Sequence, residues 1–290
     1  MTEADNVRNG PNGLPSITSE ITINGNGAET EINLDDSPKD EPFVKPAGAQ
    51  FRIFHIASGA NVTLNDLTIS GGFIGDEDAE MRDAGGGIRN HGTAVLNNAT
   101  ITKNYSYNFW HKDDDSEEGG GGITNFGIMY LTNVTVSGNK ALESKLFSHA
   151  GAGGMFSCWC DRKVDDEKPE IELTNVTITD NEATRFPGGL NIIRNGKITN
   201  TIVAGNRVES PKVDKPWNGE FPKIINLSRD CSVYRVKGDN TYVDLDNKYK
   251  RDYKEVGVSS GGNNLIGGGN ACPGLTDGVK RPGRTNGRPH

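Results

Sequence analysis

Two acidic stretches hold the side chains best suited to chemistry. The sequence reads "HKDDDSEE" at 111–118 and "DRKVDDEKPE" at 161–170. General acid–base catalysis needs two titratable groups that face one groove. The catalytic candidates in these stretches are Asp113, Asp115, Asp161 and Arg162, beside further carboxylates at Asp114, Glu117, Asp165 and Asp166. Because acidic runs in loops are usually solvated, the alternative is that none of these residues is catalytic.

The same carboxylates offer hard oxygen ligands, so Ca²⁺ is the one cofactor for which the sequence supplies candidates. No cofactor is required by any motif. The residues lack the spacing of an EF-hand loop, and the chain contains no G-G-x-G-x-D array. The metal candidates are Asp113, Asp114, Asp115 and Glu117.

Aromatic residues gather in the same segments of the chain. Exposed aromatic rings stack on sugar rings and peptides, so these residues are candidates for ligand binding. The alternative is that they pack the long loops onto the body of the protein. The predicted ligand-binding residues are Tyr105, Tyr107, Trp110, Trp159 and Trp217.

A repeat must position these residues. "LTNVTVSGN" at 131–139 and "LTNVTITDN" at 173–181 are nearly the same nine residues, and related copies begin at Leu64, Leu96 and Ile198. Four copies follow a Gly-rich motif such as "GGGIRNHG" or "GGGITNFG". The shortest complete unit is 25 residues, from Asn181 to Asn206. A fixed period of this length is typical of a solenoid.

Each unit contains short Val/Ile/Thr-rich runs with period-2 alternation, separated by Gly or Asn, which turn readily through positive φ. An antiparallel sandwich would also use short strands and regular turns, but it gives no reason to repeat Asn at one offset. The sequence therefore predicts an all-β, right-handed single-stranded parallel β-helix with long insertions on one side. Alternation places Val134 and Val136 inside, and Thr135 and Ser137 outside.

One domain is predicted over residues 1–275, with insertions at 105–118, 140–170 and 207–256, followed by a disordered tail at 276–290. The outward pairs Thr100/Thr102, Thr135/Ser137 and Thr177/Thr179 could organise water, although Thr is also simply common on exposed strands. The net charge of −8 disfavours a nucleic-acid partner, and no run of 18 apolar residues predicts a transmembrane segment.

Four cysteines leave several arrangements open. A disulfide between Cys231 and Cys272 would restrain the long excursion between them, and free thiols are the alternative. Cys158 and Cys160 form a C-x-C, for which two loop thiols are favoured over a strained local bridge.

"GGGIRNHGTAVLNNATITKN" and "GGGGITNFGIMYLTNVTVSGN" resemble coils of pectin-lyase-like right-handed β-helix proteins. More narrowly they resemble bacterial choice-of-anchor or CSLREA-type surface proteins and polymorphic outer-membrane proteins. "TNTIVAGN", "DCS", "SGGNNLIG" and "AC" resemble the last coils of that group, and the similarity covers about 10–206 and 257–275.

The resemblance implies a location outside the cell or on its surface, although the first residues do not form a signal peptide. The insertions gathered on one side of the solenoid and the aromatic residues within them favour a non-catalytic module for adhesion, glycan binding or structural display, with a polysaccharide or cell-surface glycan as partner. Because lyases and hydrolases share this fold, the alternative is a pectate-lyase-like enzyme or glycoside hydrolase acting on an acidic polysaccharide. Whether the protein is an enzyme stays open at this point.

Overall fold

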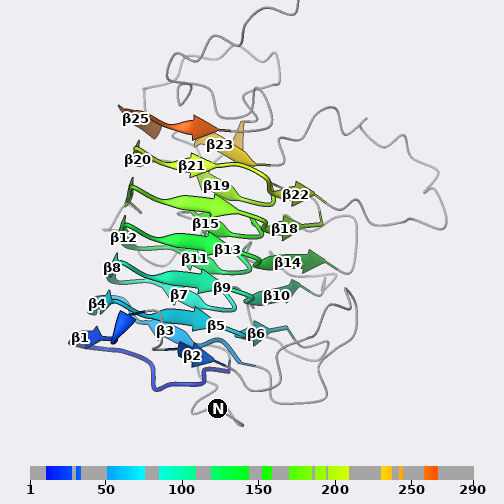
Figure 1. The fold of residues 1–290 in the computed structure, drawn as a ribbon. Coiled ribbons are helices and arrows are strands. Elements are labelled where there is room, and N and C mark those ends of the chain that lie inside the picture. The colour runs from blue at the N-terminus through cyan, green and yellow to red at the C-terminus, as the bar shows by residue number, and fades with distance from the viewer. Residues whose placement is uncertain are drawn as a thin grey trace, which may run out of the picture.

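The chain winds into stacked coils, and each coil contributes short strands to several long walls (Figure 1). The computed structural model describes residues 11–27, 31–33, 51–75, 85–108, 119–143, 152–158, 170–184, 187–193, 195–208, 230–236, 242–243 and 258–266. All the elements that these residues form are β-strands. We number the four sheets in the order in which one coil visits them.

Sheets 1 and 2 are parallel and contain seven strands each. Sheet 1 consists of β1 (Glu20–Asn24), β4 (Asn61–Asn65), β8 (Thr93–Asn97), β12 (Ile128–Thr132), β16 (Glu170–Thr174), β20 (Asn195–Thr199) and β25 (Val258–Gly262). Sheet 2 consists of β2 (Glu31–Asn33), β5 (Thr68–Ser70), β9 (Thr100–Thr102), β13 (Thr135–Ser137), β17 (Thr177–Thr179), β21 (Ile202–Val203) and β26 (Leu265–Ile266).

Sheets 3 and 4 complete each coil. Sheet 3 consists of β6 (Phe73–Ile74), β10 (Tyr105–Asn108), β14 (Lys140–Glu143), β18 (Glu182–Ala183) and β22 (Arg207–Val208). Sheet 4 consists of β3 (Phe54–Ile56), β7 (Ile88–Asn90), β11 (Ile123–Asn125), β15 (Met155–Ser157), β19 (Leu190–Ile193) and β23 (Cys231–Val236), and β24 (Tyr242–Val243) adds to β23 in antiparallel orientation.

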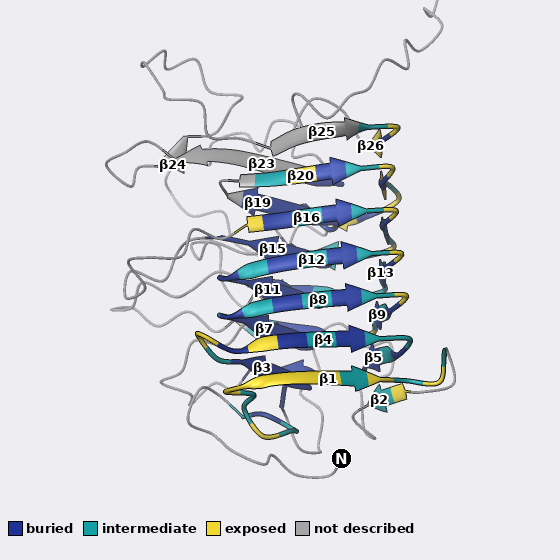
Figure 2. Ribbon diagram, turned by 90° about the vertical axis from the view of Figure 1, so that its left-hand side faces the viewer, coloured by how far each residue is buried: buried dark blue, intermediate teal, exposed yellow. Residues whose placement is uncertain are grey.

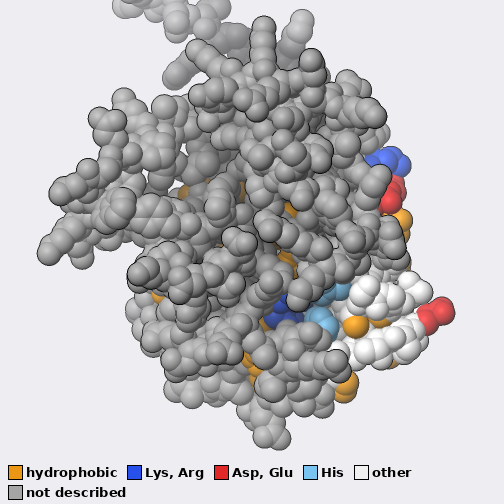
Figure 3. Space-filling model, turned by 180° about the vertical axis from the view of Figure 1, so that it is seen from behind, with side chains coloured by type: hydrophobic (Ala, Val, Ile, Leu, Met, Phe, Trp, Pro, Cys, Tyr) orange, Lys and Arg blue, Asp and Glu red, His pale blue; other side chains and the backbone are white. Residues whose placement is uncertain are grey.

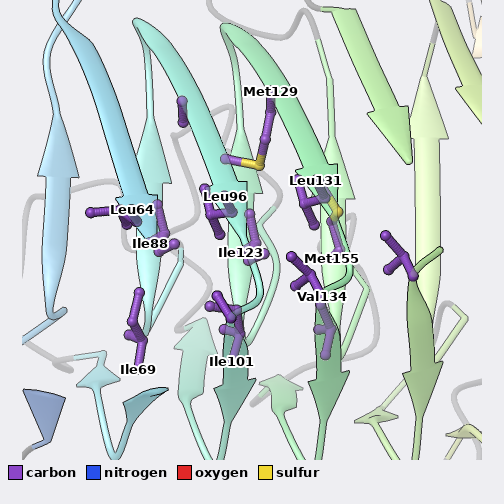
Figure 4. Close-up of a cluster of buried hydrophobic side chains, with 14 of the residues drawn as sticks. Leu64, Ile69, Ile88, Leu96, Ile101, Ile123, Met129, Leu131, Val134 and Met155 are labelled. Carbon is purple, nitrogen blue, oxygen red and sulfur yellow. The ribbon is translucent and has the colours of Figure 1, made fainter. Parts of the chain in front are cut away.

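The repeat sets the register of the coils. Leu96 pairs with Leu64 on one side and with Leu131 on the other, and the series continues through Leu173 to Ile198. All five side chains are buried in one continuous core, where each contributes about 1.5–3 kcal/mol through burial. Figure 4 shows Leu64, Leu96 and Leu131 pointing into the space between the sheets. They lie near Ile88, Ile123 and Met155 of sheet 4. The prediction of an all-β parallel solenoid is confirmed.

The alternation predicted for the repeat is also confirmed. Val134 and Val136 are 1% and 0% exposed, whereas Thr135 and Ser137 are partly exposed. In the neighbouring coils the same pattern buries the residues level with Val136, which are Ile101 and Ile178.

Sheet 3 is the part of the fold that the sequence did not indicate. Its strands occupy the first residues of segments predicted as insertions, at β10, β14 and β22. The strands are short, at two to four residues, so alternation along any one of them is too brief to be recognised. They form because each pairs with the same position of the next coil, as Tyr105 does with Lys140. β15, β23 and β24 likewise lie inside the predicted insertions 140–170 and 207–256.

A column of buried amides runs between sheets 2 and 3. The Nδ2 group of Asn104 donates to Oδ1 of Asn139 at 3.0 Å, and Asn139 donates in the same way to Asn181 at 2.9 Å. The series of hydrogen bonds continues as Asn181 Nδ2 donates to Asn206 Oδ1 at 2.9 Å. Asn206 Nδ2 then donates to the carboxylate oxygen Oδ1 of Asp230 at 3.0 Å. A carboxylate suits this last position because it accepts the bond and carries no NH₂ group that would need a further acceptor. We name this column the buried amide ladder.

A second column of amides lies on the surface, at the corner between sheets 1 and 2. Asn98, Asn133 and Asn175 have φ values of 53°, 57° and 56°, and their side chains are hydrogen-bonded in series. Asn98 donates in turn to the carboxylate of Asp66 at 3.0 Å. These asparagines therefore make the left-handed turn that the sequence predicted for the ends of its runs.

Candidate functional site

The acidic candidates for catalysis and metal binding lie outside the described residues. This applies to Asp113, Asp114, Asp115, Glu117, Asp161 and Arg162, which fall in 109–118 and 159–169. Among the residues that the structure describes, no group of three His, Cys, Asp or Glu side chains is arranged to hold a metal ion. The catalytic and Ca²⁺ predictions therefore stay predictions.

The predicted aromatic ligand-binding residues divide into two groups. Trp110, Trp159 and Trp217 lie outside the described residues. Tyr105 is 9% exposed and belongs to the hydrophobic core, where its ring lies 6.4 Å from that of Phe73. Tyr107 is partly buried and packs against the same core. Both tyrosines lie on the core-packed strand β10, as packing of the segment onto the solenoid requires, and their role in ligand binding stays a prediction.

The described cysteines are buried and neither is a free thiol. Cys158 is 1% exposed and Cys231 is 0% exposed. The prediction that Cys158 is a loop thiol is wrong, because Cys158 is disulfide-bonded. It directly follows β15, and its N–H donates to Asn125 O at 3.0 Å. Cys160 and Cys272 lie outside the described residues, so the pairing of Cys231 with Cys272 stays a prediction.

The outer face of sheet 1 brings together an aromatic ring, two carboxylates and an amine. Tyr130 on β12 is level with Glu172 on β16, and Glu172 is level with Lys197 on β20. Glu170 lies two residues before Glu172 and on the same side of the strand. Figure 2 views this sheet face-on, with partly exposed and exposed positions along its strands. We name Tyr130, Glu170, Glu172 and Lys197 the Tyr130 cluster.

Each member of the Tyr130 cluster is fixed by inward neighbours. Met129 and Leu131 flank Tyr130 and are buried in the core, so the tyrosine ring must point outward. Ile171 and Leu173 direct Glu172 outward in the same way. Since adjacent strands are about 4.8 Å apart, Tyr130, Glu172 and Lys197 form one row on a rigid wall.

The electrostatics of the cluster are dominated by its carboxylates. Lys197 Nζ lies 2.7 Å from Glu172 Oε1, with the two side chains 55% and 34% exposed. Burial raises the pKa of Tyr130, and the negative charges of Glu170 and Glu172 raise it further. Tyr130 therefore keeps its proton at physiological pH and presents an O–H donor beside two carboxylate acceptors.

Sequence reasoning missed this cluster because it assigned Glu170 to an insertion and searched for carboxylates in loops. A signal was present in the spacing. Tyr130, Glu172 and Lys197 each stand one residue before a lead residue of the repeat, at Leu131, Leu173 and Ile198. Residues at a fixed offset share one face of a solenoid, so tabulating that offset reveals the row.

Two histidines lie close together on the outer face of sheet 4. His55 on β3 and His91 just after β7 have ring centroids 5.7 Å apart. His55 Nδ1 is hydrogen-bonded to Ser16 Oγ at 2.9 Å, and Arg89 Nε donates to His91 Nε2 at 2.9 Å. Phe126 lies against His91, with ring centroids 5.0 Å apart. Figure 3 shows histidine side chains next to a basic side chain on this side of the molecule.

Both histidines are held neutral. Burial lowers the pKa of His55 to about 3, with further contributions from Arg52 and Arg89. Burial likewise lowers the pKa of His91 to about 3, with Arg89, His55 and Arg52 contributing. With pKa values lowered this far, both imidazoles are weak bases at physiological pH.

The histidine pair predicts a pH dependence of stability. Unfolded histidines titrate near 6.5 and these two titrate near 3 in the folded state, so between these values the unfolded chain binds more protons. Stability is therefore fully present above pH 6.5 and falls as the pH drops toward 3, by up to about 1.4 kcal/mol per pH unit for each histidine.

Urea unfolding at several pH values between 7 and 4 tests this dependence. The double variant His55→Gln/His91→Gln should lose less stability over this range than the wild type. Both proteins contain the same acidic residues, so the difference between their curves reports the two histidines. Parallel curves for the two proteins would contradict the assignment.

The fold that the sequence implied, a parallel β-solenoid, is present, and no helix among the described residues is long and apolar enough to cross a membrane. No family model, no curated protein and no solved structure matches the chain.

Proposed function

We propose that this protein is a non-catalytic β-helix module of the cell surface or extracellular space, which binds glycans in adhesion or structural display. We further propose that it belongs with the pectin-lyase-like β-helix proteins of bacterial surfaces that its coils resemble. The observation that carries the binding role is the Tyr130 cluster on the outer wall of sheet 1.

The chemistry of the cluster suits a sugar ring. The apolar face of a pyranose packs on an aromatic ring such as that of Tyr130, while its hydroxyls donate hydrogen bonds to carboxylates. Glu170 is exposed and Glu172 is one-third exposed, so both offer acceptor oxygens beside the ring. Hydrogen bonds to charged groups contribute about 1.5–3 kcal/mol each.

Charge restricts the class of glycan. The two glutamates outnumber the one lysine of the cluster, and Lys197 is already paired with Glu172. An acidic polysaccharide would bring further negative charge to this wall, so the cluster favours neutral sugars. An open wall also leaves the bound sugar in water, which suits reversible binding more than hydrolysis.

The test is a glycan array followed by calorimetry on the neutral oligosaccharide that binds best. Tyr130→Ala should weaken binding by about tenfold or more, equivalent to 1.4 kcal/mol. Thr63→Ala is the matched control, because Thr63 lies in the same outward row two coils away and should leave binding unchanged.

Three outcomes would contradict the proposal. Binding that survives in Tyr130→Ala would assign the ligand to another surface. The absence of binding to any glycan would remove the proposed role. Release of reducing ends from a polysaccharide, lost in Glu170→Gln, would identify a hydrolase, because Glu170 and Glu172 stand about 6.6 Å apart along their strand, close to the spacing of roughly 5–9.5 Å between hydrolase carboxyls.

A further inference from the structure

The outer face of sheet 2 carries hydroxyl groups in two straight rows. The first row contains Thr68, Thr100, Thr135 and Thr177, and the second contains Ser70, Thr102, Ser137 and Thr179. The strands pair residue for residue over these four coils, without a bulge. The sequence indicated three such pairs, and the register adds a fourth at Thr68 and Ser70. Ser70 is 3% exposed and its hydroxyl donates to Glu31, so the other seven hydroxyl residues form the exposed part of the face. We name these eight residues the hydroxyl face.

The hydroxyl face is held rigid from behind. Between the two rows each strand directs one apolar side chain inward, and these side chains, Ile69, Ile101, Val136 and Ile178, are all 0% exposed. Threonine is stiff about χ1 because its Cβ is branched. Binding through this face therefore costs little side-chain entropy.

A third polar row runs beside the first two. The surface amides of Asn98, Asn133 and Asn175 stand two residues before Thr100, Thr135 and Thr177. Their side chains are fixed by bonds of 3.0 and 3.1 Å to one another. Each amide oxygen and NH₂ group retains capacity for one further hydrogen bond. These rows form a two-dimensional array of fixed donors and acceptors.

The array is uncharged over its central coils, in a chain whose net charge is −8. Charged and apolar residues appear only at its ends. Glu31 precedes Thr68 in the first row, and Ile202 and Leu265, which are 42% and 53% exposed, follow Thr177. Beside the second row, the exposed Lys103 and Asp180 carry opposite charges and leave no net charge on the central coils, so the face suits a neutral partner.

The spacing identifies the kind of neutral partner. Neighbouring hydroxyls are about 4.8 Å apart between coils and about 6.6 Å apart along a strand. A partner that meets all rows at once must repeat in two dimensions and present donors and acceptors equally. A single flexible glycan meets one row at a time. A crystalline lattice of water meets every row, because each hydroxyl and amide can replace one lattice hydrogen bond.

We propose that the hydroxyl face binds ice. Threonine hydroxyls hold water in fixed positions and their methyl groups separate these positions, so the first layer of the lattice forms on the protein surface. This activity is separate from the proposed glycan binding, because it uses sheet 2 and not sheet 1.

Thermal hysteresis and partition into a growing ice front test the proposal on the full chain. The wild type should be enriched in ice and should lower the freezing point below the melting point. Thr135→Tyr, at the centre of the first row, should lose most of both effects because the ring lifts the lattice off the face. Thr93→Tyr on sheet 1 is the matched control and should retain both. Tyrosine is favoured in strands, so both variants are expected to fold.

The remaining arms make the test decisive. Thr100→Val keeps the shape of the side chain without the hydroxyl. This variant should lose part of its enrichment in ice and of its thermal hysteresis, whereas Thr135→Tyr should lose most of both. Absence of wild-type enrichment in ice, or equal losses in Thr135→Tyr and Thr93→Tyr, would overturn the proposal. Binding to crystalline cellulose that Thr135→Tyr abolishes, without ice activity, would assign the face to a solid polysaccharide instead. Tyr130→Ala should keep ice activity, which separates failure here from failure of the glycan proposal.

Discussion

Replacing Asn139 with alanine is expected to lower the free energy of unfolding by about 4 kcal/mol, because several buried polar groups lose their partners together. Asn139 is 0% exposed and is the second member of the buried amide ladder, between Asn104 and Asn181. Its Oδ1 accepts from both the backbone N–H and the Nδ2 group of Asn104, each at 3.0 Å. Its Nδ2 donates to Ile101 O at 2.9 Å and to Asn181 Oδ1 at 2.9 Å. Alanine leaves these groups buried without replacement by water.

Urea unfolding followed by circular dichroism measures this loss, and Asn133→Gly supplies the matched control. Asn133 lies in the same coil and in the other amide column, but it is exposed, and glycine accepts its φ of 57°. The control should lose less than about 1 kcal/mol, because water replaces its hydrogen bonds. Similar losses in the two variants would show that burial of the ladder is not what stabilises the coils.

Asn139→Asp separates the acceptor from the donor. The aspartate keeps the oxygen that Asn104 uses and loses the NH₂ group that reaches Ile101 and Asn181. It also places a charge in the interior next to the oxygen of Asn181. Asp230 shows that a carboxylate is accommodated at the end of the ladder, where no onward donation is needed.

The repeat was sufficient to predict an all-β parallel solenoid, although not sheet 3, because its information is local. Alternation around Val134 and Val136 defines which side of a strand faces inward, and the shared lead residues define the register. The role of the repeated asparagines was only half predictable. Asn98 and Asn133 turn through positive φ as expected, but Asn139 does not, and it is instead a member of the buried ladder. That role depends on a contact between residues in different coils, which no single copy of the repeat reveals.

The candidate site was less predictable for the same reason. The Tyr130 cluster draws its four residues from three strands, and Tyr130, Glu172 and Lys197 come together only when the coils stack. Loops attract attention in a sequence because they interrupt the period. The residues of the Tyr130 cluster instead lie on a regular wall of the solenoid. In the sequence, each of them looks like an ordinary outward-facing strand position.

Replacing Gly121 with alanine is expected to be among the most damaging additions of a single methyl group at the described glycines. A Cβ atom at this position would lie 2.2 Å from Lys140 O, 2.4 Å from Lys140 C and 2.6 Å from Gly153 O. These are backbone atoms on two sides, so no flexible side chain can move aside. Gly121 N–H also donates to Ala152 O at 3.0 Å, and its carbonyl accepts from Gly86 N–H at 2.9 Å, which ties it to both neighbouring coils.

The expected loss is about 3 kcal/mol or more, at the upper end of what overpacking costs. Gly138→Ala is the control that separates the steric clash of an added Cβ from the strain of a positive φ. Gly138 has a φ of +65°, but the nearest atom to an added Cβ is Thr102 Oγ1 at 3.5 Å, so only conformational strain of about 1–2 kcal/mol applies. Urea unfolding of both variants gives the two values on one scale.

The same contact explains why Gly recurs before sheet 4. Gly86, Gly121, Gly153 and Gly188 each face the carbonyl of the first residue of a sheet 3 strand, at Tyr105, Lys140, Glu182 and Arg207. A methyl group would push these strands away from the core and with them the start of every long insertion. If Gly121→Ala unfolds at the same urea concentration as Gly138→Ala, close packing between these walls is not what the repeated glycine provides, and sheet 3 is free to shift relative to the rest of the solenoid.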